Sequence, residues 1–83
     1  MSDQNKLVIL NYISSNATPG IPSRISFNSL GKIIKLSKQE LEAFLVELNK
    51  QGFISQYAKK GVDSFTVVIN QKGLDAVQDE SFS

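Results

Sequence analysis

Apolar residues recur at helical spacing in the middle of the chain and define its clearest element. Leu41, Phe44, Leu45 and Leu48 stand three or four residues apart, so they share one face of a helix. The polar residues between them would occupy the opposite face. The pattern predicts an amphipathic helix whose apolar side packs against a core.

Signals at both ends set the extent of this helix. Ser37 and Glu40 are three residues apart, the spacing of a capping box, in which each side chain bonds to the other residue's backbone amide. Gly52 can adopt the left-handed conformation that ends a helix, and Phe53 supplies the apolar residue that often follows. We therefore predict a helix from Ser37 to about Gln51.

The rest of the chain predicts three helices and three strands. In chain order these are a helix over residues 3–15, a loop over 14–22, a short strand over 24–27, a helix over 28–36 that precedes the long helix, strands over 53–58 and 64–69 joined by a hairpin loop over 59–63, and a short helix over 70–77. The first helix is apolar around much of its circumference, so it should be buried on more than one side. This order predicts a single α+β domain that is mainly helical.

Particular residues are expected to shape these elements. Asn28 or Ser29 would cap the second helix. Gly31 inside that helix is unfavourable by about 1 kcal/mol relative to alanine, which close packing against another helix would explain. The residues expected to face inward are Leu30, Ile33 and Ile34 in the second helix, and Leu74 and Val77 in the last.

Composition narrows the possible chemistry. The 83 residues include no cysteine and no histidine, so the commonest general base and the commonest zinc ligands are absent. We expect no enzymatic activity, no metal and no cofactor. No apolar run approaches the roughly 20 residues that span a bilayer. The first residues also lack the basic-then-apolar order of a signal peptide, so we expect a cytoplasmic protein.

Charge is unevenly distributed, although the net charge is only +1. Residues 20–72 contain eight basic residues (Arg24, Lys32, Lys35, Lys38, Lys50, Lys59, Lys60, Lys72) and four acidic ones (Glu40, Glu42, Glu47, Asp63). The C-terminal Asp75, Asp79 and Glu80 lower the total. A basic middle segment permits binding to nucleic acid.

The chain resembles the small bacterial and archaeal winged-helix regulators, including the MarR-like and PadR-like groups. The family pattern of Leu-Ser, spaced apolar residues, Gly and two apolar residues falls on Leu36, Ser37, Leu41, Leu45, Leu48, Gly52, Phe53 and Ile54. The strand-to-helix exit of these families falls on residues 69–73, where Asn70 replaces the usual threonine and can serve as an N-cap. The resemblance covers roughly residues 5–77. It implies a winged helix-turn-helix domain over residues 1–78, followed by a frayed acidic tail over residues 79–83.

The resemblance also implies a transcriptional regulator that binds duplex DNA as a homodimer. The long helix would enter the major groove, and the hairpin would form a wing beside it. The expected DNA contacts are Arg24, Ser29, Lys32, Lys35, Ser37, Lys38, Gln39, Glu42, Lys59 and Lys60. The expected dimer contacts, on the apolar first helix, are Val8, Ile9 and Tyr12.

Two other interpretations stay open. One is a winged-helix module that binds protein and never touches DNA, for example a subunit adaptor. Glu40, Glu42 and Glu47 favour it, because carboxylates on the polar side of the long helix would repel phosphates. The other is a phage- or plasmid-encoded accessory protein that modulates a host regulator. Binding of mixed duplex DNA at low and moderate salt would separate the DNA-binding regulator from the protein-binding module.

Overall fold

The computed structural model describes the backbone of residues 2–79 and the side chains of residues 4–79. Its elements are α1 (Ser2–Asn16), β1 (Ser23–Ser26), α2 (Phe27–Ile34), α3 (Lys38–Gln51), β2 (Ile54–Lys60), β3 (Ser64–Ile69) and α4 (Gln71–Asp79). The predicted α+β class, mainly helical, is confirmed. Asp79 ends α4, and the rest of the expected acidic tail lies outside the described residues.

The three strands form one antiparallel sheet in the order β1-β3-β2. The β2–β3 hairpin has a bulge between Ser55 and Ala58, where Gln56 adopts a positive φ of 55°. In the β1–β3 ladder Ser26 pairs with Ser64, at the end of β3 nearest the hairpin loop. The start of α2 therefore lies beside the hairpin loop, residues 61–63.

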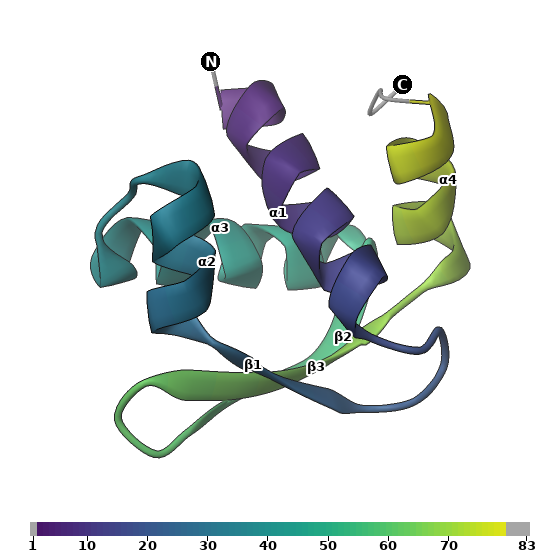
Figure 1. Ribbon diagram of the computed structural model, residues 1–83. Helices are drawn as coiled ribbons and strands as arrows, with labels where there is room; N and C mark the ends of the chain where they lie inside the picture. The colour runs from purple at the N-terminus through teal and green to yellow at the C-terminus, as the bar shows by residue number, and fades with distance from the viewer. Residues whose placement is uncertain (1, 80–83) are drawn as a thin grey trace.

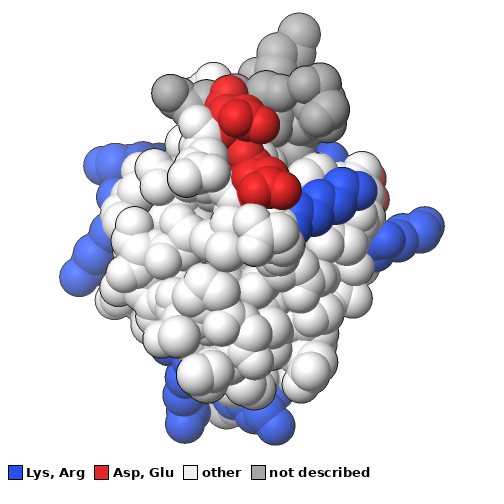
Figure 2. Space-filling model, turned by 90° about the vertical axis from the view of Figure 1, so that its right-hand side faces the viewer, with Lys and Arg blue, Asp and Glu red and all other residues white. Residues whose placement is uncertain are grey.

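The helices lie on one side of the sheet, with α1 between α2 and α4 (Figure 1). Seen from the side of α4, uncharged side chains fill the centre of the surface and basic side chains project at its edges (Figure 2). Acidic side chains gather at the top of this view, where α4 lies; the described acidic residues of α4 are Asp75 and Asp79.

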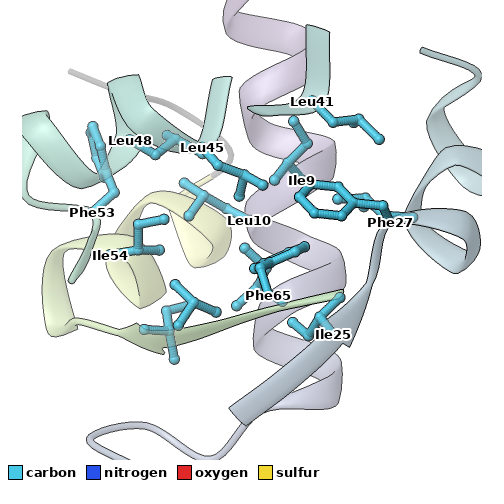
Figure 3. Packing of buried hydrophobic residues seen from close by; sticks show 14 of the residues in the cluster. Ile9, Leu10, Ile25, Phe27, Leu41, Leu45, Leu48, Phe53, Ile54 and Phe65 are labelled. Carbon is cyan, nitrogen blue, oxygen red and sulfur yellow. The ribbon is translucent and has the colours of Figure 1, made fainter. Parts of the chain in front are cut away.

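The core joins α1, α2, α3 and β3 (Figure 3). Its fully buried side chains include Ile9, Leu10 and Ile13 from α1; Leu30 from α2; Leu41, Leu45 and Leu48 from α3; and Phe65, Val67 and Ile69 from β3. The ring of Phe65 lies 4.8 Å from that of Phe27 and 5.6 Å from that of Tyr57, measured between centroids. The apolar face predicted for α3 is thus confirmed, with Phe44 at its half-buried edge.

Both ends of α3 are as predicted. The Glu40 amide donates to the Ser37 hydroxyl (3.2 Å), and the Ser37 amide donates to the Glu40 carboxylate (3.2 Å), which completes the capping box. Gly52 has a φ of 87°, a conformation that costs glycine little, and the Phe53 amide bonds to the Leu48 carbonyl.

The predicted N-cap of α2 was wrong, and of its three predicted inward residues Leu30 and Ile34 are confirmed but Ile33 is not. Ser26, not Asn28 or Ser29, is the N-cap, and its hydroxyl accepts from the Ser29 amide (3.3 Å). Because the helix begins at Phe27, its buried side is set by Phe27 and Leu30, with Ile34 half-buried. Ile33 lies about a quarter turn away and is 53% exposed.

The close packing expected at Gly31 is also absent. A Cβ built there would meet its nearest neighbours, the Leu36 carbonyl and the Leu41 side chain, at 3.7 and 3.9 Å. These are ordinary contact distances, so the backbone does not require glycine at this position.

The predicted N-cap and buried residues of α4 both differ from those in the structure. The Asn70 side chain does not cap α4: its amide donates to the Gly52 carbonyl (3.0 Å), and its oxygen accepts from the Ser55 hydroxyl (3.0 Å). Gly73 and Ala76 are the buried residues of α4, whereas the predicted Leu74 and Val77 are half-buried at the edge of the core.

Candidate nucleic-acid interface

Strand β2 lies alongside α3 and runs antiparallel to it, with the hairpin loop beyond its end. Three hydrogen bonds link β2 and this loop to α3 in order: Asn49 Oδ1 accepts from the Tyr57 amide (3.4 Å), Glu42 Oε1 from Lys59 Nζ (3.0 Å), and the Val62 carbonyl from Lys38 Nζ. From residue 57 to residue 62, the partners on α3 move from its C-terminal half to its first residue. The hairpin loop is consequently held at the N-terminal end of α3.

Four exposed residues form a single stripe along the outer side of α3. Gln39, Ala43, Val46 and Lys50 are spaced so that, at about 3.6 residues per turn, they lie within a narrow arc of the helix. That arc is diametrically opposite the buried leucines of α3. We call these four residues the outer stripe; Val46 at its middle is 55% exposed.

The three glutamates of α3 lie outside the outer stripe, and each has a partner. Glu40 belongs to the capping box. Glu42 pairs with Lys59 at 3.0 Å on the hairpin side, and Glu47 lies 3.9 Å from Lys6 of α1. The carboxylates that were expected to repel DNA phosphates therefore flank the outer stripe, and the stripe itself contains no acidic group.

A tyrosine packs beside the ion pair of Glu42 and Lys59. Burial raises the pKa of Tyr57, and the charge of Glu42 raises this pKa further. The Tyr57 hydroxyl is buried and has no hydrogen-bond partner within residues 4–79. It therefore stays protonated at neutral pH and acts as part of the apolar wall behind α3.

An open groove of about 430 Å³ lies between α2, the start of α3 and the hairpin loop. It is lined by Phe27, Asn28, Gly31, Lys32, Lys35, Leu36, Lys38, Leu41 and Asp63. We call it the lysine groove. Within the described part of the chain, the side chains of Lys32 and Lys35 are exposed and make no hydrogen bond or ion pair. Their ammonium groups remain available to an anionic ligand.

Lys35 occupies the groove in an uncommon backbone conformation. It is the C-cap of α2 with a φ of 59°, and its amide bonds to the Gly31 carbonyl at 2.8 Å. Glycine or asparagine usually fills this position, because a Cβ is unfavourable there. The third lysine, Lys38, is partly engaged: besides its bond to Val62, its ammonium lies 5.3 Å from the centre of the Phe27 ring.

Asp63 is the acidic residue of the lysine groove, and its carboxylate is already used. It accepts from the Ser26 hydroxyl (2.9 Å) and the Asn28 amide (3.4 Å), while its carbonyl accepts from the Phe27 amide (2.7 Å). A negative charge at a helix N-terminus is favourable. Asp63 therefore fastens the hairpin loop to α2, and no local sequence signal predicts this role.

Basic residues also stand at the hairpin end of the sheet. Arg24 donates from Nε to the Ser64 hydroxyl (2.9 Å), and that hydroxyl donates to the Lys60 carbonyl (2.6 Å). The Lys60 side chain is exposed and makes no hydrogen bond or ion pair within residues 4–79. Arg24 and Lys60 are thus placed together, next to the loop that borders the lysine groove.

The expected DNA contacts fall into two groups. Lys32, Lys35 and Lys38 share the lysine groove, Arg24 and Lys60 lie at the hairpin end, and Gln39 begins the outer stripe. The others take part in contacts within the fold, although their contact with DNA stays a prediction: Ser37 caps α3, the Ser29 backbone amide donates to the Ser26 hydroxyl, and Glu42 and Lys59 form an ion pair.

The sequence-based site omitted three residues of the outer stripe. Ala43 and Val46 are small apolar residues, and Lys50 was noted only as one of the basic residues, yet these three occupy the middle and far end of the exposed face of α3. Their spacing relative to the buried leucines could have identified them.

Fewer of the predicted dimer contacts on α1 are accessible than expected. Ile9 is completely buried in the core and cannot contact a second chain, so its assignment to a dimer interface was wrong. Val8 and Tyr12 remain half-exposed. Two shallow depressions meet at Val8 and Asn11; the lining residues are Gln4, Leu7 and Val77 for one and Tyr12, Ser15 and Ile33 for the other.

Comparison of the chain with protein-family models, curated proteins and solved structures found no match. Over residues 2–79, no helix combines the length and apolar character needed to cross a membrane. Within the same residues, no acidic side chains cluster in a way that could hold a metal ion.

Proposed function

We propose that the chain is a winged helix-turn-helix domain that binds duplex DNA and regulates transcription. In this proposal α2 and α3 form the helix-turn-helix, and the β2–β3 hairpin is the wing. One observation carries the proposal: the centre of the exposed face of α3 bears no carboxylate, and the lysine groove opens at its N-terminal end.

The dimensions of α3 suit the major groove. Its 14 residues make a rod of about 21 Å, and a helix fits a groove about 12 Å wide. With the outer stripe against the bases, Lys32 and Lys35 would meet one phosphate backbone. Arg24 and Lys60 at the wing would contact another part of the backbone. Phosphate contacts of this kind fix the position of a protein on DNA without reading its sequence.

A dimer would double these contacts. Val8 and Tyr12, on the half-exposed side of α1, are the proposed contacts between two copies, with Val77 and Ile33 beside them. Two α3 helices would then enter successive turns of the major groove, about 34 Å apart. Sedimentation velocity should show a dimer that Val8→Glu converts to a monomer. A monomer at millimolar concentration in the unmodified protein would contradict this part of the proposal.

Titration of a mixed-sequence duplex by fluorescence anisotropy, at several salt concentrations, tests DNA binding. We expect binding that weakens steeply with salt, and we expect Lys32→Gln combined with Lys35→Gln to reduce the slope of log K against log salt by about two, since each phosphate contact contributes about 0.9.

The control is Thr18→Glu combined with Gln78→Glu, which changes the net charge equally at exposed positions away from the lysine groove. These positions belong to the α1–β1 loop and to α4. If both double variants reduce the slope alike, net charge alone drives binding and the proposed interface is wrong. Absence of binding at low salt would overturn the DNA-binding proposal itself.

A protein-binding module is the second candidate. The exposed Val46, with Ala43 beside it, favours this function, because exposed apolar side chains also suit a protein partner. The same titration separates the two candidates: only a DNA-binding domain gives a salt-dependent complex that is sensitive to Lys32 and Lys35.

A further inference from the structure

The side chains of the outer stripe indicate which bases a DNA-binding α3 would prefer. Between Gln39 and Lys50 the stripe contains only Ala43 and Val46, both apolar. Val46 keeps 55% of its surface exposed, because it lies on the side of α3 opposite the core. A short apolar segment is thus presented at the centre of the helix face that would enter the major groove.

The major groove offers one apolar group to such a segment. Thymine presents a 5-methyl group there, whereas the edges of guanine, cytosine and adenine are hydrogen-bonding groups. Guanine is usually read by arginine or lysine, and the centre of the outer stripe carries neither. Cytosine is read by a carboxylate, but Glu42, the nearest one, is paired with Lys59 at 3.0 Å.

Gln39 supplies the complementary polar contact. Its side chain is exposed and makes no hydrogen bond within the described residues, so its amide is free to bond adenine N6 and N7 together. From Gln39 to Val46 the helix rises by about 10 Å. This distance corresponds to about three base-pair steps of 3.4 Å.

We propose that the outer stripe reads adjacent A·T pairs, with Ala43 and Val46 contacting thymine methyl groups and Gln39 contacting adenine. This inference rests on the proposed DNA binding and names the bases it would prefer. The lysine groove supplies affinity through phosphates, and the outer stripe supplies the preference.

Three 20-base-pair duplexes test this proposal. They are alternating d(AT), the same duplex with deoxyuridine in place of thymidine, and alternating d(GC). Deoxyuridine keeps the base pairing and removes only the methyl group. We expect the d(AT) duplex to bind most tightly, with a loss of about fourfold for each contacted methyl group that is removed.

The variant Val46→Ala shows whether the preference comes from the outer stripe. It should lower the ratio of d(AT) to deoxyuridine affinity by about twofold to fourfold. The matched control is Ile21→Ala in the α1–β1 loop, because Ile21 is 56% exposed and lies off α3. It should leave the ratio unchanged, and neither exposed substitution should prevent folding.

The outcomes distinguish this proposal from the one on which it rests. Equal binding of all three duplexes, or a thymine preference that Val46→Ala does not alter, would overturn base reading by the outer stripe and leave DNA binding intact. Failure to bind any duplex at low salt would overturn DNA binding as well.

Discussion

Lysines of neighbouring segments lie beside both ends of α3, and their side chains are used in opposite ways. At the C-terminal end, Lys72 donates to the Gln51 carbonyl (2.8 Å) and lies 4.7 Å from the centre of the Phe53 ring. At the N-terminal end, Lys32 and Lys35 project into an open groove without a partner among the described residues. The lysine beside the C-terminal end of α3 thus stabilises a contact within the fold, whereas those beside the N-terminal end leave their charges free.

The C-terminal end is closed because side chains from β2 and from residues 70–72 at the entry to α4 bond to the backbone there and to one another. The side chain of Asn70 bonds to the Gly52 carbonyl and the Ser55 hydroxyl, and its backbone amide donates to the Phe53 carbonyl at 3.2 Å. Gly73 packs so closely that an added Cβ would lie 2.4 Å from that same carbonyl. We call Gly52, Phe53, Ser55, Asn70 and Gly73 the α3–α4 joint. The comparison shows that available partners, more than residue type, separate a binding surface from a structural contact.

The largest expected effect is at the joint. Gly73→Ala should lower the free energy of unfolding by about 3 kcal/mol, because the new methyl group meets backbone that cannot move aside easily. Urea denaturation measures the change. Gly31→Ala in the lysine groove is the matched control, and it should raise stability by about 0.5–1 kcal/mol because its Cβ has room. Equal effects of the two substitutions would show that the ends of α3 do not differ in packing.

Loss of the Asn70 side chain should have the next largest effect. Asn70→Ala leaves the Gly52 carbonyl and the Ser55 hydroxyl unpaired in a half-buried position, which costs about 2 kcal/mol. Asn49→Ala, which removes only an exposed 3.4 Å hydrogen bond, should cost much less. The folded Asn70→Ala protein should bind DNA as tightly as the parent. Weaker binding by the fully folded variant would place the joint within the interface.

Lys35→Gly should separate stability from binding. Glycine removes the strain of a left-handed lysine, so the free energy of unfolding should rise by about 1 kcal/mol. The variant also removes an ammonium group from the lysine groove, so the salt slope of DNA binding should fall by about one. Thermal denaturation and anisotropy measure the two quantities. A more stable variant with unchanged binding would exclude Lys35 from the interface.

The smallest expected effects are those of single lysine substitutions near the two ends of α3. Lys32→Gln should reduce the salt slope by about 0.9 without changing stability, since its side chain contacts water. Lys72→Gln should leave the slope unchanged and lower stability by about 0.5–1 kcal/mol, because it loses its contact with the Phe53 ring. The opposite pattern would reverse the roles assigned to the two ends.

Much of the helical fold could be predicted because its signals are local. The capping box of Ser37 and Glu40, the leucine spacing of α3 and the stop at Gly52 all act within a turn or two of one helix. Prediction failed where a distant segment decided the local structure. The start of α2 was misplaced because Asp63, about 35 residues away in the chain, holds Ser26 and the first turn in position.

The candidate site shows the same division. The basic residues were identified from composition and position, but their availability was not. Lys59 and Lys38 are engaged by Glu42 and Val62, whereas Lys32 and Lys35 are not. Ile9 was assigned to an outer surface because a helix apolar on several sides does not reveal which side its own domain covers.

The sequence by itself determined the helices, their order and the buried face of α3, since caps and periodicity depend on neighbouring residues. Tertiary structure alone decided which lysines stay free, which glutamates are neutralised and how the hairpin loop is fastened to α2. These outcomes depend on strand register and on side chains that meet across the fold, where sequence separation carries little information about distance.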